Sequence, residues 1–168
     1  QFADVAAALR ERINEGHLDR GVALIDPTTA WIDVQVEIAA DAVIEPGVTL
    51  VGATSIGART RIGSGSRIEA TSIGEDCTVR SSAIEGSTIA SHVDVGPFAH
   101  IRPGCSIASN CHVGNFAELK AELIAGGTNF ASETDSEVVA HLVANANERT
   151  GDYAGAVRTY RRGLEVEP

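Results

Sequence analysis

The stretch AVIEPGVTLVGATSIGARTRIGSGSRI, residues 42–68, places a large aliphatic side chain at every sixth position. The column continues in both directions, with four steps of five residues in place of six. Its members are Ile32, Ile38, Ile44, Leu50, Ile56, Ile62, Ile68, Ile73, Val79, Ile84, Ile89, Val95, Ile101, Ile107, Val113, Leu119 and Ile124. Repetition of this kind is typical of a solenoid. We therefore expect residues 30–124 to form stacked, very short β-strands.

Two further columns run in register with the aliphatic one. Small or β-branched residues precede it by two positions: Ala42, Val48, Thr54, Thr60, Ser66, Thr71, Cys77, Ser82, Ser87, Val93, Ala99, Cys105 and Cys111. Residues that tolerate a positive φ follow it by three positions: Asp41, Gly47, Gly65, Asp76, Gly104 and Asn110. Each hexapeptide then supplies one strand and one corner, and three hexapeptides close one coil. The predicted fold is mainly β, a left-handed parallel β-helix of hexapeptide repeats.

The three cysteines, Cys77, Cys105 and Cys111, all fall in the small inward column. We interpret them as buried space-filling residues rather than reactive thiols. Their odd number favours no disulfide framework, and residues 1–25 lack the apolar core of a signal peptide. Both observations predict a cytoplasmic location.

Both ends of the chain depart from the repeat. Residues 2–15 carry apolar side chains at helical spacing, and residues 136–148 and 152–165 read as two helices around a Thr-Gly-Asp turn. The expected organisation is an N-terminal helix and linker at 1–25, the β-helix at 26–128 and a C-terminal α-hairpin at 129–168.

Composition limits the classes of partner. The formal net charge of −10 argues against nucleic acid, which needs a basic surface. No apolar run is long enough to span a membrane, so no membrane partner is expected.

Three segments carry a resemblance to a known family: LRERINEGHLDRGVALIDPTTAWID (9–33), VGPFAHIRPG (95–104) and HVGNFAELK (112–120). Over residues 9–128 the chain resembles the acetyltransferase domain of the bifunctional N-acetylglucosamine-1-phosphate uridyltransferase/glucosamine-1-phosphate acetyltransferase. The resemblance implies a homotrimer in UDP-N-acetylglucosamine biosynthesis, with sites between subunits. It implies acetyl-CoA as co-substrate and the sugar phosphate glucosamine 1-phosphate as acceptor.

The resemblance assigns substrate binding to Arg102 and Lys120, which match the residues that hold the sugar phosphate. The repeat agrees, because each follows a column aliphatic and they lie one coil apart on one face. Two cations about 5 Å apart on neighbouring coils repel unless an anion joins them. The alternative is that both are ordinary solvated surface cations.

The resemblance stops before the catalytic residue. The family continues with a KxxHLxY segment whose His acts as general base, whereas this chain has GGTNFASETDSEVVAHLV at 126–143. His141 lies in a helical pattern and is interpreted as an ordinary helix residue, so the catalytic residue is unknown. His92, His100 and His112 lack ligand spacing, so no metal site is predicted.

The segment 115–164 is similar to part of the glutaminase domain of glutamine–fructose-6-phosphate aminotransferase, with Asp135 in its SETD motif. That chemistry needs an N-terminal cysteine and this chain begins with Gln1, so we expect no glutaminase activity. Residues 148–168 are similar to half of a tetratricopeptide repeat. Together the resemblances indicate a chimera joined near GNFAELK.

Two principal functions follow. The first is an acetyltransferase-like domain that binds sugar phosphate with weak or no catalysis. The second is a non-catalytic trimeric scaffold or interaction module, in which the C-terminal helices cover the open end of the solenoid or bind a partner helix.

Overall fold

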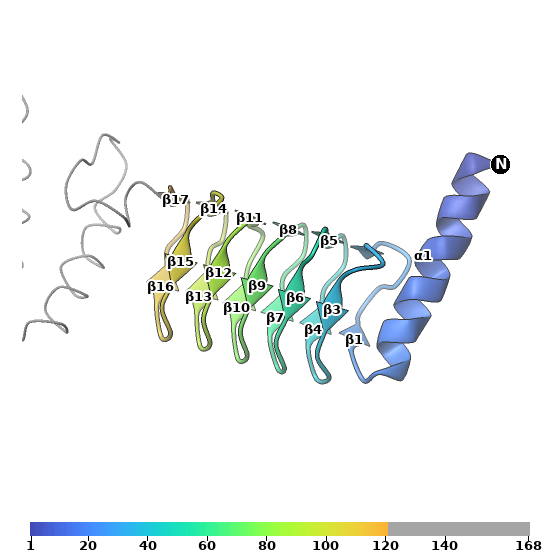
Figure 1. Ribbon diagram of the computed structural model, residues 1–168, viewed down its shortest axis with the longest axis horizontal. Coiled ribbons are helices and arrows are strands. Elements are labelled where there is room, and N and C mark those ends of the chain that lie inside the picture. The colour runs from blue at the N-terminus through green and yellow to red at the C-terminus, as the bar shows by residue number, and fades with distance from the viewer. Residues whose placement is uncertain (121–168) are drawn as a thin grey trace, which may run out of the picture. The chain divides into compact units, whose positions relative to one another are not determined.

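The computed structural model describes residues 1–120, which form one helix followed by seventeen short strands (Figure 1). The strands make three sheets, and each strand pairs in parallel with the third strand before or after it. This is the pairing of a three-sided coil, and it confirms the left-handed parallel β-helix expected from the hexapeptide repeats. The expected rung at Ile124 and the α-hairpin at 129–168 lie outside the described residues.

Each face of the coil is one sheet. The first contains β1 (Ala23–Leu24), β4 (Val43–Ile44), β7 (Arg61–Ile62), β10 (Thr78–Val79), β13 (Asp94–Val95) and β16 (His112–Val113). The second contains β2 (Trp31–Ile32), β5 (Thr49–Val51), β8 (Arg67–Glu69), β11 (Ala83–Glu85), β14 (His100–Ile101) and β17 (Glu118–Leu119). The third contains β3 (Glu37–Ile38), β6 (Ser55–Ile56), β9 (Ser72–Ile73), β12 (Thr88–Ile89) and β15 (Ser106–Ile107).

The core is the aliphatic column read from the sequence. Ile44, Leu50, Ile62, Ile68 and Ile84 are each 0% exposed, and every one stacks on its counterpart in the neighbouring coil. The small column is also buried, from Ala42 to Cys105, whereas Cys111 is partly exposed. Burial of both columns in every coil removes apolar surface from water, so stability comes from stacking.

Corners between strands adopt the left-handed backbone expected of them. Asp41, Asp76 and Asn110 have φ of 64°, 56° and 62°, as the turn-former column predicts. Bulkier residues also occupy this conformation, namely Arg59, His92, Phe98 and Phe116. Positive φ is uncommon for such side chains, so the sequence pattern does not indicate them.

The first strand was not anticipated. The column begins at Ile32 in the sequence, yet Leu24 pairs with Ile44 and belongs to it. Leu24 and Ile32 are eight positions apart, because the chain turns at Asp26 through bonds to Thr28 and Thr29. Because of this wider turn, a search for aliphatic residues six positions apart does not detect the strand at Leu24.

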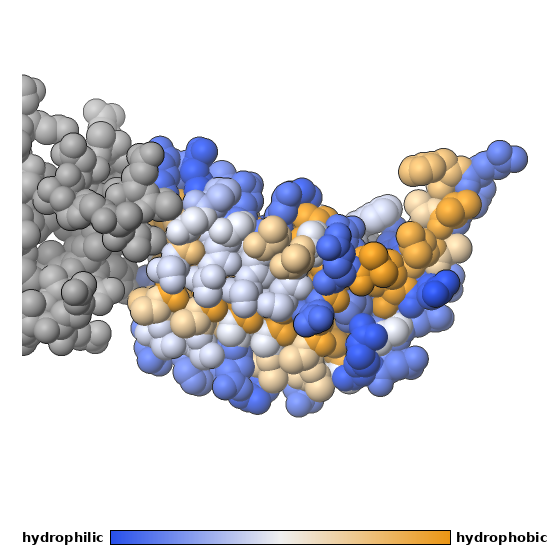
Figure 2. Space-filling view, in the orientation of Figure 1, coloured by the Kyte–Doolittle hydropathy of each residue, from blue (hydrophilic) through white to orange (hydrophobic). Residues whose placement is uncertain are grey.

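Helix α1 spans Phe2–Asp19, four residues beyond the expected end at residue 15. Its buried residues are polar, Asn14 and His17, while Phe2, Val5 and Leu9 are 89%, 68% and 52% exposed. Figure 2 shows apolar side chains along this helix. Among residues 1–120, no helix combines the length and apolar character needed to cross a bilayer.

Candidate functional site

Arg102 and Lys120 lie next to each other on the second sheet. Each follows a buried or half-buried strand residue, Ile101 in β14 and Leu119 in β17, so each points away from the core. The backbone N–H of Arg102 donates to the carbonyl of Leu119 at 2.9 Å, which holds the two coils in register. The structure thus brings together the two cations singled out by the sequence.

Glu118 joins these cations. One carboxylate oxygen accepts a hydrogen bond from Arg102 Nε, and the other lies 3.8 Å from Lys120 Nζ. The Arg102 hydrogen bond holds the pKa of Glu118 below its ordinary value, with smaller contributions from the charges of Lys120 and His100. The two cations were expected to repel unless an anion joined them. The structure supplies that anion from the protein itself, the carboxylate of Glu118.

His100 lies directly opposite Glu118 in the pairing of β14 and β17. Its Nε2 atom is inaccessible to solvent and makes no hydrogen bond, although Glu85 Oε1 of β11 lies 3.5 Å away. Arg102, Lys120, Glu85 and Glu118 carry charges that sum to zero. The face therefore holds a balanced group of five polar side chains, termed here the Glu118 cluster.

Two aromatic rings stand at the corner that leads into these strands. Phe98 and Phe116 stack with ring centroids 5.4 Å apart, and both are largely exposed. Phe98 lies two residues before His100, where β14 begins, and Phe116 lies two residues before Glu118, where β17 begins. Both have a left-handed backbone conformation. Sequence reasoning missed this pair. The signal that could have found it is the recurrence of Phe one coil apart, in GPFAH and GNFAE.

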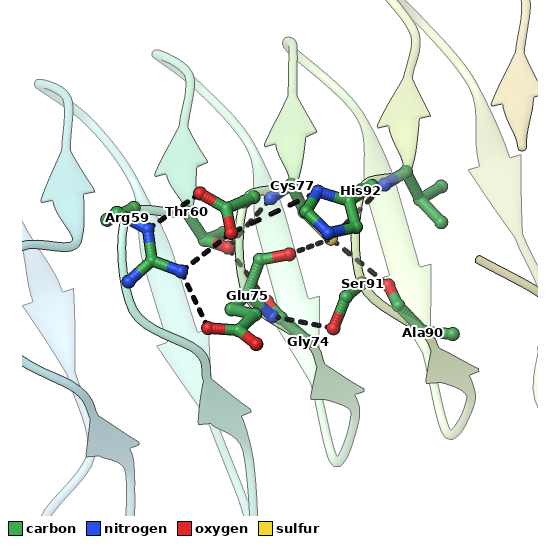
Figure 3. Close-up of polar contacts among 10 residues, drawn as sticks. Arg59, Thr60, Gly74, Glu75, Cys77, Ala90, Ser91 and His92 are labelled. Atoms are coloured by element: carbon green, nitrogen blue, oxygen red, sulfur yellow. Dashed lines mark hydrogen bonds and ion pairs between the residues drawn. The ribbon is translucent and has the colours of Figure 1, made fainter. Parts of the chain in front are cut away.

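A second polar cluster occupies another corner (Figure 3). The Arg59 guanidinium donates to Asp76 at 2.7 Å and to Glu75 at 2.6 Å, and His92 Nδ1 lies 4.0 Å from Asp76. The Arg59 contact lowers the pKa of Asp76. Both acids face a cation of the protein itself, and the side chains are exposed or half-buried, so we interpret this cluster as a surface ion-pair network.

Cysteines and histidines form no further centre in the described part of the chain. Cys77 and Cys105 are 1% and 2% exposed, and burial raises the pKa of both thiols. No group of three or more metal-ligating side chains occurs among residues 1–120. Asp135 and His141 lie outside the described residues.

The chain is similar to proteins named "Bifunctional protein GlmU". It is 47% identical to that of Streptococcus suis (strain 98HAH33) over 76% of this chain and 28% of the relative. It is 48% identical to that of Lactobacillus delbrueckii subsp. bulgaricus (strain ATCC BAA-365 / Lb-18), with the same coverage. It is 40% identical to that of Streptococcus agalactiae serotype V over 92% of this chain and 34% of the relative.

Residues 84–162 match the family model described as "Glutamine amidotransferase domain". The part of this match that the structure describes, residues 84–120, folds as β-helix from β11 to β17. The chain thus has two similarities that overlap on the coils of the Glu118 cluster. It spans 28–34% of the length of the GlmU proteins named above.

Proposed function

We propose that this chain is a GlmU-like acetyltransferase region of UDP-N-acetylglucosamine biosynthesis, one that binds glucosamine 1-phosphate and has weak or no acetyl transfer from acetyl-CoA. The observation that carries the binding proposal is the pairing of Arg102 with Lys120 on neighbouring coils of one face. Similarity to GlmU proteins over most of the chain supports the pathway.

Physical chemistry favours a phosphate as the occupant. A guanidinium and an ammonium held side by side complement a phosphate dianion through charge-assisted hydrogen bonds. The chain as a whole carries a net charge of −10, so anions gain nothing from the overall field. Binding therefore has to come from a local group of cations, which these two side chains supply.

Weak or absent turnover is proposed because the segment that follows the Glu118 cluster departs from the family pattern. Acetyl transfer to an amine needs a general base within hydrogen-bond reach of that amine. The sequence at 126–143 contains no KxxHLxY motif. We accordingly assign no catalytic residue, and acetyl-CoA enters only as the co-substrate of residual activity.

The binding proposal is tested by thermal unfolding with glucosamine 1-phosphate. At about tenfold over Kd, a ligand specific for the folded state adds about 1.4 kcal/mol to the free energy of unfolding. We expect a rise in Tm that the double variant Arg102→Ala, Lys120→Ala loses. Arg61→Ala, which breaks a similar pair with Glu45 on the first sheet, should keep the shift. No shift in the parent protein at millimolar ligand would refute binding.

A non-catalytic trimeric scaffold or interaction module is the second candidate. The observation that favours it is the internal charge balance of the Glu118 cluster, which needs no ligand to neutralise its cations. An acetyl-transfer assay on protein freed of contaminating enzyme separates the candidates. Steady turnover that depends on Arg102 would refute the scaffold and also the claim of a missing base.

The proposal also includes the oligomeric state of the protein and its place in the cell. We propose a cytoplasmic homotrimer whose sugar-phosphate sites lie between subunits. Size-exclusion chromatography with light scattering measures the mass directly, and a monomer at micromolar concentration would contradict this arrangement. We further propose that the chain is a chimera joined near GNFAELK, residues 114–120, with half of a tetratricopeptide repeat at 148–168.

A further inference from the structure

Glu118 occupies the position that an external anion would need. Its two carboxylate oxygens face the two cations, Arg102 Nε and Lys120 Nζ. A carboxylate and a phosphate group compete for the same guanidinium donors. A ligand anion therefore has to remove Glu118 from Arg102 before it can bind both cations.

The neighbouring strand offers Glu118 a second partner. His100 is its direct cross-strand neighbour, and side chains directly opposite on adjacent strands are close enough to interact. The Nε2 atom of His100 makes no hydrogen bond, and Glu85 Oε1 lies 3.5 Å from it, a distance too long for a strong bond. The imidazole can therefore accept a second carboxylate as a partner.

We propose that Glu118 is a displaceable internal anion: an incoming dianion such as phosphate or sulfate takes Arg102 and Lys120, and Glu118 turns to His100. This inference rests on the proposed anion site and adds a regulation to it. Glu118 and His100 act here as positioning residues, because they set how readily the cations become available.

The groups that face His100 are Glu85 on β11 and Glu118 and Lys120 on or after β17, together with Arg102 on its own coil. Arg102 and Lys120 oppose Glu85 and Glu118, so a dianion added beside the cations leaves an excess of negative charge there unless Glu118 moves away.

The first experiment measures competition. Calorimetric titration with sulfate at constant ionic strength compares the parent chain with Glu118→Gln and, as a second variant, Glu118→Ala. We expect both variants to bind sulfate about fivefold more tightly, which is the size expected for removing two exposed ion pairs. The matched control is Glu69→Gln, which breaks the Arg67 pair on the same sheet and should leave the affinity unchanged.

Outcomes of this titration separate the two proposals. Equal or weaker binding by both Glu118 variants, with measurable binding by the parent chain, would overturn displacement while the anion site stands. Loss of binding in all variants and the parent would overturn the site itself. Binding that survives Arg102→Ala and Lys120→Ala in the Glu118→Gln background would place the anion elsewhere and overturn both.

The second experiment tests the receiving role of His100. We expect His100→Ala to bind sulfate more weakly than the parent chain, because the displaced Glu118 then lacks its cross-strand partner. His92→Ala, at another corner, should leave the affinity unchanged. Equal affinity in the parent chain and His100→Ala would overturn the receiving role.

Discussion

Asn14 of α1 donates its side-chain amide to the carbonyl oxygen of Pro27 at 2.7 Å and reaches Ala30 at 3.2 Å. Pro27 and Ala30 belong to the loop between β1 and β2, so one buried side chain ties the helix to the first coil. The side-chain oxygen of Asn14 has no partner, which shows that its role here is to donate. The helix is thus attached to the open end of the β-helix by polar contacts.

Replacement of Asn14 by Ala should lower the free energy of unfolding by about 2–4 kcal/mol, because two carbonyl groups lose a buried donor. Asn14→Asp should be at least as harmful, since a carboxylate cannot donate to carbonyl oxygens. Urea titration followed by the fluorescence of the single tryptophan, Trp31, measures the change. Glu15→Ala, one position along on the exposed side, should stay within about 0.5 kcal/mol of the parent. An Asn14→Ala variant as stable as that control would show that the cap does not depend on this contact.

His17 should make the same end of the molecule sensitive to acid. It is 2% exposed, and burial, followed by the charge of Arg20, lowers its pKa. Arg20 donates to His17 Nδ1 at 2.9 Å, a bond that needs the neutral ring. In the unfolded chain, histidine protonates at about pH 6.5. The unfolded state then binds the proton first, so stability is present above about pH 6.5 and is lost as pH falls below it.

Measurement of the free energy of unfolding between pH 7.5 and 5 tests this sign, over roughly the interval in which histidine titrates. The parent chain should lose stability more steeply than His17→Gln. His92→Gln serves as the control, because its imidazole is exposed beside Asp76 and its removal should not flatten the profile in this way. A parent chain whose stability falls no faster than that of His17→Gln would mean that burial of the neutral ring contributes nothing.

The sequence predicted the coil well because the coil is local and repetitive. Ile62 and Ile68 can both reach the core only if each hexapeptide makes one strand and one corner, so spacing alone determines their burial. Leu24 escaped because an irregular turn at Asp26 interrupts the spacing. A search for a fixed spacing finds the regular strands but does not find a single strand that breaks the spacing.

The candidate site was predictable to the level of backbone position. Arg102 and Lys120 are 18 positions apart in an unbroken series of sixes, so their adjacency follows from the repeat. The bridge by Glu118 does not follow, because its side chain could equally turn toward His100, and only torsion angles decide between them. The Phe98–Phe116 stack was hidden by a backbone conformation that aromatic residues seldom adopt.

Gly57 should be among the least replaceable residues of the described coils. A Cβ atom there would lie 2.4 Å from the carbonyl carbon of Gly74 in the next coil, a backbone atom that cannot move aside alone. We expect Gly57→Ala to destabilise the chain by about 3 kcal/mol or more, since overpacking against backbone forces two coils apart. Gly65→Ala meets no atom within 4 Å and should cost only the left-handed backbone penalty of about 1–2 kcal/mol. Similar midpoints for the two variants in urea would contradict the close approach.

Thiol reactivity tests the inward column directly. Cys77 and Cys105 are buried, and burial raises the pKa of each thiol, which depletes the reactive thiolate. Cys111 is partly exposed at the same column position. Under native conditions at pH 8, about half a unit below the ordinary thiol pKa, a disulfide reagent should label Cys111 first and the other two only upon unfolding. Mass spectrometry of tryptic peptides identifies the labelled residue, and Cys111→Ser removes the fast phase as a control. Rapid labelling of Cys77 in the folded chain would show that the coil opens there or that the column does not face inward.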